Sequence, residues 1–289
     1  MMTRKLFAAL VFTLIAAFAV QAQKTQLTSV FDSRNIVKTN LSQPEIDKVI
    51  KAFSTKESEF FEALKRYSFH REVTIQSLGF GGQISGEYRL DSNLTILANG
   101  SRQEKILFAP ISTLTDFTIG REDIEDLNGV NQFALEPSKI NQYAFTFLGK
   151  EKIDELDLYV FDVAPKVMPN PKKSKERFFQ GRIWVDDKDL QIVKTQGKGV
   201  PEGKNSRYAV VEIFREQIDG KYWFPTYSYA NDDLIFDSAP AARIKIKIKY
   251  SDYKEAQTDV KILDDDTVVE ETKPTAKPTA TPSPTPKKP

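Results

Sequence analysis

The clearest alternation of hydrophobic and polar residues lies near the C-terminal end of the chain, in residues 243–253. Ile244, Ile246, Ile248 and Tyr250 alternate there with lysines. Successive side chains of a β-strand point to opposite faces of a sheet. The pattern therefore predicts an antiparallel strand with one buried and one solvated face.

Weaker patterns of the same kind predict a meander of strands in the second half of the chain. Between Tyr143 and Gly149, aromatic residues alternate with small or polar ones. Asp-rich or Gly-containing turns separate two later pairs of segments, which is typical of β-hairpins. The predicted strands are 143–149, 156–163, 177–185, 190–195, 208–216, 221–229, 234–236 and 243–253.

The first half of the chain predicts a helix followed by strands. Ser42 with Glu45 forms a capping pattern, and apolar residues follow at helical spacing as far as Leu64. Ser54 with Glu57 matches a second capping pattern, so either one helix or two short helices are expected. From Tyr67 the spacing changes, and it predicts strands at 73–78, 84–90, 94–97 and 105–108.

The two ends of the chain differ from the middle. Residues 1–22 combine a basic start, a short apolar run and a small-x-small ending, which predicts a signal peptide cleaved after Ala22. Residues 263–289 are acidic and then rich in Pro, Thr and Lys, so they are expected to be disordered. Between them we expect an N-terminal extension at 23–41 and one β-rich domain at 42–262. The protein is therefore expected to be periplasmic or secreted.

Composition excludes several functional classes. The chain has no Cys, which rules out disulfides, thiol nucleophiles and cysteine-ligated metals. It has 41 basic and 40 acidic residues, and losing Arg4 and Lys5 with the signal peptide changes the net charge from +1 to −1. A balanced chain lacks the basic surplus that nucleic-acid binding requires, so no nucleic-acid partner is expected.

No catalytic or metal site is expected. His70 is the only histidine, and no Gly-x-Ser-x-Gly motif supplies a serine nucleophile. Asp186, Asp187 and Asp189 are spaced unlike an EF-hand loop and predict a hairpin turn. We therefore expect a protein that is not an enzyme and that has no cofactor.

The hairpin at 178–194 resembles that of LolA/LolB-like proteins, the outer-membrane lipoprotein-sorting proteins and their envelope relatives. Its residues are Phe178-Phe179-Gln180-Gly181-Arg182-Ile183-Trp184-Val185-Asp186 followed by Asp189-Leu190-Gln191-Ile192-Val193-Lys194. Residues 220–226 and the strand at 244–250 fit the same meander, so the resemblance spans roughly 143–253. It implies a β-rich α+β fold, a half-open antiparallel β-barrel with helices packed on its concave side. The LolB-type N-terminal cysteine is missing.

The resemblance also implies a function. It suggests an exported envelope protein that holds the acyl chain of a lipid or lipoprotein in an apolar cavity, as carrier or chaperone. Its partners would be a lipid or an acylated protein, with envelope or membrane-surface components as further contacts. The alternative is a ligand-free structural or interaction module with the same sheet solidly packed. The candidate cavity residues are Phe53, Phe60, Phe61, Phe145, Phe147, Trp184, Tyr222, Phe224, Ile246 and Ile248.

Overall fold

The computed structural model describes residues 31–96, 102–119, 135, 137–171, 177–203, 207–237 and 240–255. The chain divides into two compact units, Met1–Ala256 and Gln257–Pro289, and every described residue belongs to the first. The predicted signal peptide at 1–22 and the predicted tail at 263–289 lie outside the described residues.

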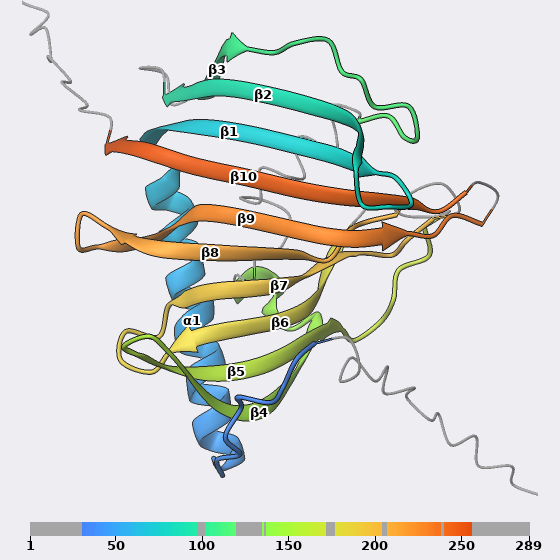
Figure 1. The fold of residues 1–289 in the computed structure, drawn as a ribbon. Coiled ribbons are helices and arrows are strands. Elements are labelled where there is room, and N and C mark those ends of the chain that lie inside the picture. The colour runs from blue at the N-terminus through green and yellow to red at the C-terminus, as the bar shows by residue number, and fades with distance from the viewer. Residues whose placement is uncertain are drawn as a thin grey trace, which may run out of the picture. The chain divides into compact units, whose positions relative to one another are not determined.

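Ten antiparallel strands form one sheet in the order β3-β2-β1-β10-β9-β8-β7-β6-β5-β4 (Figure 1). The N-terminal hairpin strands join the sheet beside the last strand, where β1 pairs with β10 over almost its whole length. The strand bounds are β1 Tyr67–Leu78, β2 Ile84–Ile96, β3 Arg102–Phe108, β4 Tyr143–Ile153, β5 Leu156–Pro165, β6 Phe178–Asp186, β7 Ile192–Val200, β8 Val211–Ile218, β9 Tyr222–Leu234 and β10 Ala242–Glu255.

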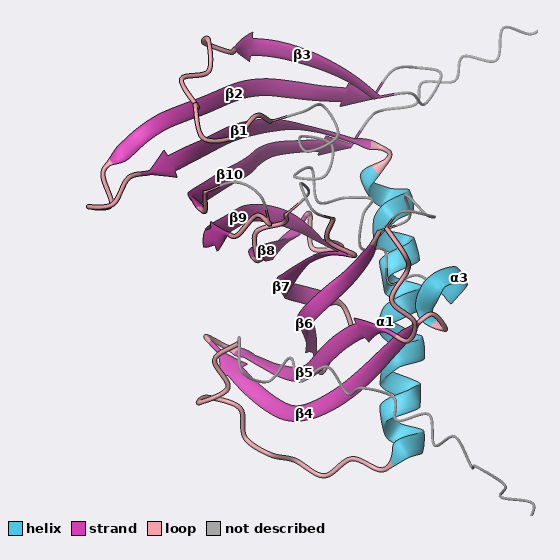
Figure 2. Cartoon of the chain, turned by 90° about the vertical axis from the view of Figure 1, so that its right-hand side faces the viewer, coloured by secondary structure: helices cyan, strands magenta, loops and turns pink. Residues whose placement is uncertain are grey.

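The sheet is curved but not closed. Strands β3 and β4 form its two edges and do not pair with one another. The long helix α1, Gln43–Leu64, crosses the strands on the inner side of the bend, and the short helix α3, Pro137–Ile140, lies beside it (Figure 2). The predicted half-open antiparallel sheet with helical cover on its concave side is confirmed.

The helix begins at the capping pattern of Ser42 with Glu45, as predicted. It continues past Ser54, so the region forms one helix rather than two short ones. The backbone N–H of Ser42 donates to the Glu45 carboxylate at 2.8 Å, which satisfies one of the free amides at a helix start. Ser54 does not cap a second helix, since its hydroxyl donates to the carbonyl of Lys51 at 3.0 Å within one continuous helix.

Several predicted strand boundaries were wrong. The segments 84–90 and 94–97 were expected to be separate strands, but β2 runs unbroken to Ile96, because every residue except Ser85 pairs with β1 or β3. Residues 234–236 were expected to form a strand, but Leu234 is the last residue of β9.

Three hydrophobic clusters stabilise the described part of the chain. On the inner side, the β4–β7 core joins the first half of α1 to β4, β5, β6 and β7. The β1/β10 core, also on the inner side, joins the end of α1 to β1, β2, β9 and β10. The outer cluster, around Leu158, Val160, Trp184 and Val193, lies on the other face. The predicted alternation in β10 is confirmed, since Ile244, Ile246, Ile248 and Tyr250 are all buried.

Candidate functional site

The inner side of the sheet holds nine of the ten residues expected to line a cavity. Phe53, Phe145 and Phe147 belong to the β4–β7 core. Phe53 is fully buried, and its ring centroid lies 5.7 Å from that of Phe145 and 6.0 Å from that of Phe161. Edge-to-face contacts at these distances are favourable for aromatic rings. These rings thus make ordinary core contacts between helix and sheet.

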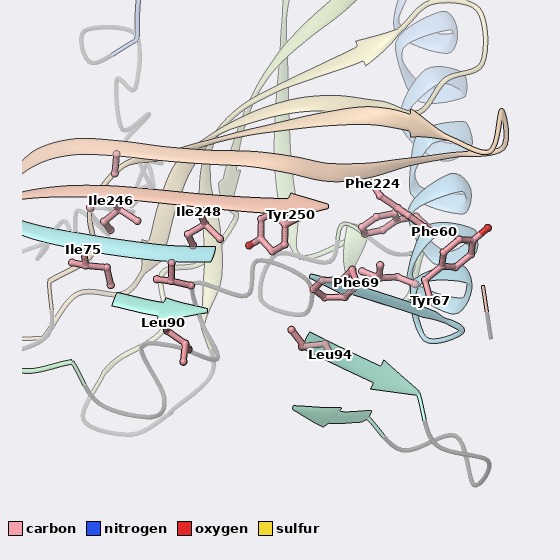
Figure 3. Packing of buried hydrophobic residues seen from close by; sticks show 14 of the residues in the cluster. Phe60, Tyr67, Phe69, Ile75, Leu90, Leu94, Phe224, Ile246, Ile248 and Tyr250 are labelled. Atoms are coloured by element: carbon pink, nitrogen blue, oxygen red, sulfur yellow. The ribbon is translucent and has the colours of Figure 1, made fainter. Parts of the chain in front are cut away.

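The other six residues belong to the β1/β10 core, whose lining extends further than the helix. Figure 3 shows Phe60 and Phe224 beside α1, and Ile75, Leu90 and Ile246 further along the strands. The predicted residues in this core are Phe60, Phe61, Tyr222, Phe224, Ile246 and Ile248. The apolar lining therefore continues over β1, β2 and β10 beyond the reach of the helix.

Trp184 does not share this side, so its expected place on the concave face was wrong. It packs in the outer cluster against Leu158 and Val160, and its indole N–H donates to Glu151 at 2.7 Å. Residues on either side of it, including Ile183, point inward to the β4–β7 core. Alternation along β6 places Trp184 on the outer face.

A buried ion pair fastens the helix to the sheet. The Glu57 carboxylate of α1 accepts hydrogen bonds from both terminal nitrogens of Arg215 in β8, at 2.5 and 3.2 Å. The guanidinium of Arg215 also lies 4.3 Å from the centroid of the Phe60 ring. Breaking a buried pair leaves an uncompensated charge, which is strongly unfavourable. This contact therefore holds the C-terminal half of α1 in place.

An irregular segment, residues 109–119, packs on the lining where the helix does not reach. Thr113 donates its N–H to the Glu87 carbonyl at 2.9 Å, on the part of β2 that has no β3 neighbour. A Cβ on Gly86 would lie 2.5 Å from the Thr113 carbonyl oxygen, so the close approach requires glycine. The apolar residues of the segment that contact the β1/β10 core are Leu114, Phe117 and Ile119.

Arg71 introduces a positive charge into this apolar lining. It lies in β1 between Phe69 and Val73 on the buried register, and its side chain is completely buried. One terminal nitrogen, Nη2, donates to the Glu104 carboxylate of β3 at 2.5 Å. Its Nε and Nη1 atoms are buried and have no hydrogen-bond acceptor. Unpaired buried donors are rare and unfavourable, so this arrangement calls for an explanation.

Polar side chains flank Arg71 on both neighbouring strands. Ser92 of β2 and Tyr250 of β10 are its direct cross-strand partners. The Ser92 hydroxyl is buried without a hydrogen-bond partner. Burial raises the pKa of Tyr250 to about 12, so its hydroxyl keeps its proton at neutral pH. Together these residues form a polar row across an apolar surface, and we call Arg71, Ser92, Glu104 and Tyr250 the Arg71 row.

The sequence contained a signal for this row that the strand predictions missed. The predicted strand began at Val73, whereas β1 begins at Tyr67. Extending the alternation back through Phe69 places Arg71 among residues of the buried register. A charged residue at a core position of a strand is rare and often paired or functional.

The other candidate residues form ordinary contacts. His70 lies on the opposite face from Arg71, with Nδ1 2.9 Å from the Asn93 side-chain oxygen. The Asp186 carboxylate accepts the N–H groups of Lys188 and Asp189, as in a tight hairpin turn between β6 and β7. Within the described ranges, no group of three or more His, Asp or Glu residues is placed to hold a metal ion.

None of the helices that the structure describes is both long and apolar enough to span a bilayer. No protein-family model matches the chain, and no curated protein sequence matches it.

Two solved structures are similar to the chain at low identity. One is a DUF1329 family protein from Desulfovibrio piger, with a TM-score of 0.34 and 18% identity over 74% of this chain and 94% of that one. The other is a LolA superfamily protein from Nitrosomonas europaea, with a TM-score of 0.31 and 15% identity over 70% of this chain and 93% of that one.

Proposed function

We propose that this protein is a non-enzymatic carrier or chaperone of the bacterial envelope that binds the acyl chain of a lipid or lipoprotein on the inner side of its sheet. The observation that supports the proposal is the extent of the apolar lining. Buried residues such as Ile75, Leu90 and Ile246 continue the β1/β10 core along the strands away from α1. The described segment that packs there is irregular in structure rather than helical.

The helix α1 and the segment 109–119 both pack on the inner side of the sheet, but they are held there differently. A helix satisfies its own backbone hydrogen bonds, and α1 is further fixed by the Glu57–Arg215 pair. The segment 109–119 makes backbone hydrogen bonds to β2 only at Thr113 among its described contacts. Displacing it would expose apolar surface, and an acyl chain would restore burial at about 0.8 kcal/mol per CH₂ group.

One observation favours the second candidate, a ligand-free structural or interaction module. The predicted cavity residues Phe53 and Phe224 are completely buried and make close ring contacts with their neighbours. A lining that is already packed in this way leaves them no surface for a ligand. The two candidates therefore differ in whether the protein takes up an apolar molecule.

The test is native mass spectrometry on the protein purified from its own envelope fraction, followed by titration with dodecanol. The carrier proposal expects a co-purified acyl species or saturable dodecanol binding. Ala230→Phe, which adds bulk to the β1/β10 core, should weaken that binding. Ala144→Phe is the matched control, because Ala144 is exposed in β4. A bare mass and no dodecanol uptake would favour the packed module.

A further inference from the structure

We infer that Arg71 binds the anionic group, carboxylate or phosphate, of an amphiphilic ligand whose apolar chain lies along the β1/β10 core. This inference rests on the proposed function and goes beyond it, because it assigns the chemical class of the head group. It is carried by the geometry of the Arg71 row and by the donors that this row leaves unused.

The hydrogen bonding of Arg71 is incomplete for a fully buried guanidinium. Among the described residues its ion-pair partner is Glu104, which accepts from Nη2 and leaves Nε and Nη1 without an acceptor. The planar guanidinium fits carboxylate and phosphate oxygens with two parallel hydrogen bonds. The parallel donors are Nε with Nη2, as in the Arg182–Asp162 pair, or Nη1 with Nη2, and each terminal nitrogen carries two hydrogens. An anion could therefore accept from one unpaired nitrogen of Arg71 and from the second hydrogen of Nη2, while Glu104 kept the first.

The neighbours of Arg71 suit such an anion. Ser92 lies directly across on β2 with a buried, unpartnered hydroxyl, which can donate to an anionic oxygen. Tyr250 lies directly across on β10, and its hydroxyl is hydrogen-bonded with Ser228 and stays protonated at neutral pH, so it adds an uncharged polar group beside the anion. No carboxylate other than Glu104 is hydrogen-bonded to Arg71 in the described chain.

The surroundings of the row suit the rest of an amphiphile. On one side the next cross-strand pair is Phe69 with Leu94. On the other side Val73 lies between Leu90 and Ile248. All five side chains are buried in the β1/β10 core. A ligand with its charge at Arg71 would thus have an apolar surface on either side of its head group.

Glu104 acts as an internal counter-ion for the unliganded state. Its side chain is 36% exposed, so one end of the ion pair reaches solvent while Arg71 does not. If a second anion binds to Arg71, water can still stabilise the charge of a partly exposed carboxylate, whereas a fully buried carboxylate would have no such compensation. The arrangement keeps the buried charge neutralised before a ligand arrives.

The experiment compares three ligands with the same chain: dodecanoate, dodecyl phosphate and dodecanol, titrated at pH 8 by calorimetry or native mass spectrometry. The wild-type protein should bind the two anions about tenfold or more tightly than the alcohol, because hydrogen bonds to charged groups are stronger than neutral ones. Arg71→Met should remove this preference and leave dodecanol binding unchanged. Arg89→Met, which changes an exposed arginine of β2, should alter neither.

A second variant keeps the inference testable if Arg71→Met does not fold. Glu104→Gln preserves Arg71 and removes the competing carboxylate, so it should tighten dodecanoate binding and leave dodecanol binding unchanged. A purely structural ion pair would shift stability in both variants without changing the ratio of acid to alcohol affinity.

The outcomes separate the two proposals. Equal binding of dodecanoate and dodecanol by the wild-type protein would overturn the role of Arg71 and leave the carrier proposal standing. Binding of none of the three ligands would overturn both. Inorganic phosphate is titrated as a chain-free control, and if it bound as tightly as dodecyl phosphate, the amphiphile would be overturned and only a free-anion site would remain.

Discussion

Two arginines of this sheet are completely buried, and they differ in how their charges are satisfied. Arg182, on the outer face of β6, donates from Nε and Nη2 to the Asp162 carboxylate at 2.8 and 3.3 Å. Its Nη1 donates to the Asp32 carbonyl and the Ser33 hydroxyl at 2.9 and 3.0 Å. Arg71, on the inner face, has a single ion-pair partner and two nitrogens without acceptors.

The difference shows what each arginine does in the fold. Arg182 contacts residues 31–33 of the N-terminal region, where the Phe31 ring lies 5.5 Å from the guanidinium, and it fastens these residues to the sheet. All three guanidinium nitrogens of Arg182 have acceptors within the protein, so we assign it a structural role. Arg71 fastens only β3, through a carboxylate that reaches solvent. The incomplete pairing of Arg71, against the complete pairing of Arg182, is what marks the inner face as the place for a ligand.

The largest expected effect is that of Arg182→Met. The change leaves Asp162 buried without its partner and frees the segment around Ser33, so the free energy of unfolding should fall by about 3–5 kcal/mol. Urea denaturation monitored by tryptophan fluorescence would measure it. A loss below 1 kcal/mol in the free energy of unfolding would contradict the structural role assigned to Arg182.

A somewhat smaller effect is expected for Glu57→Gln on the inner face. The amide keeps one hydrogen bond to Arg215 but not the charge, so the free energy of unfolding should fall by about 2–3 kcal/mol. Arg215 retains its contacts with the Ile192 carbonyl and the Phe60 ring, which limits the loss. Lys56→Gln, in an exposed pair of the same helix, is the control and should change stability little.

Alkaline pH should weaken the inner face through Tyr250. Its pKa is raised to about 12 mainly by burial, whereas in the unfolded chain a tyrosine titrates near 10. The folded state therefore binds more protons between these values, and stability should fall by about 2 kcal/mol as pH rises from 10 to 12. Thermal unfolding across this range would show a shallower slope for Tyr250→Phe. An unchanged slope would mean that other groups carry the pH dependence.

The smallest effect on stability is expected for Arg71→Met. The change removes two unpaired buried donors along with the charge, and Glu104 can turn to solvent, so the free energy of unfolding should change by about 1 kcal/mol or less. The same urea titration applies. A loss as large as that of Arg182→Met would mean that Arg71 is a structural residue and would remove the contrast between the two arginines.

The buried face of a strand was easier to predict from the sequence where the other face is exposed to solvent. In β10, lysines alternate with buried residues such as Ile246, and the strand and its buried face were both predicted correctly. In β6, nearly every residue is buried, because residues 31–33 pack on Arg182 on the outer face and α1 packs on the inner one. The polar residues Gln180, Arg182 and Asp186 share the register of Trp184, but Arg182 and Asp186 are buried, so this polar face is not a solvated face. The face of Trp184 was predicted wrongly.

The candidate site shows the same limit. Aromatic residues such as Phe53 and Phe60 were identified from their spacing along a helix, and both lie on the inner side. Arg71 was missed, because the change to strand spacing was placed at Tyr67 but the alternation was followed only from Val73. Its partners lie about 20 and 180 residues away, at Ser92 and Tyr250, and only strand pairing brings them together.

The sequence by itself determined the local elements of this protein: one amphipathic helix, a meander of strands with Asp and Gly turns, and an apolar face on the last strand. Those features follow from interactions between residues close in the chain. Tertiary structure alone decided that β1 pairs with β10, which side of the sheet Trp184 occupies and which donors Arg71 leaves unpaired. These outcomes depend on contacts between distant segments, whose choice is governed by the burial of the whole sheet rather than by any local pattern.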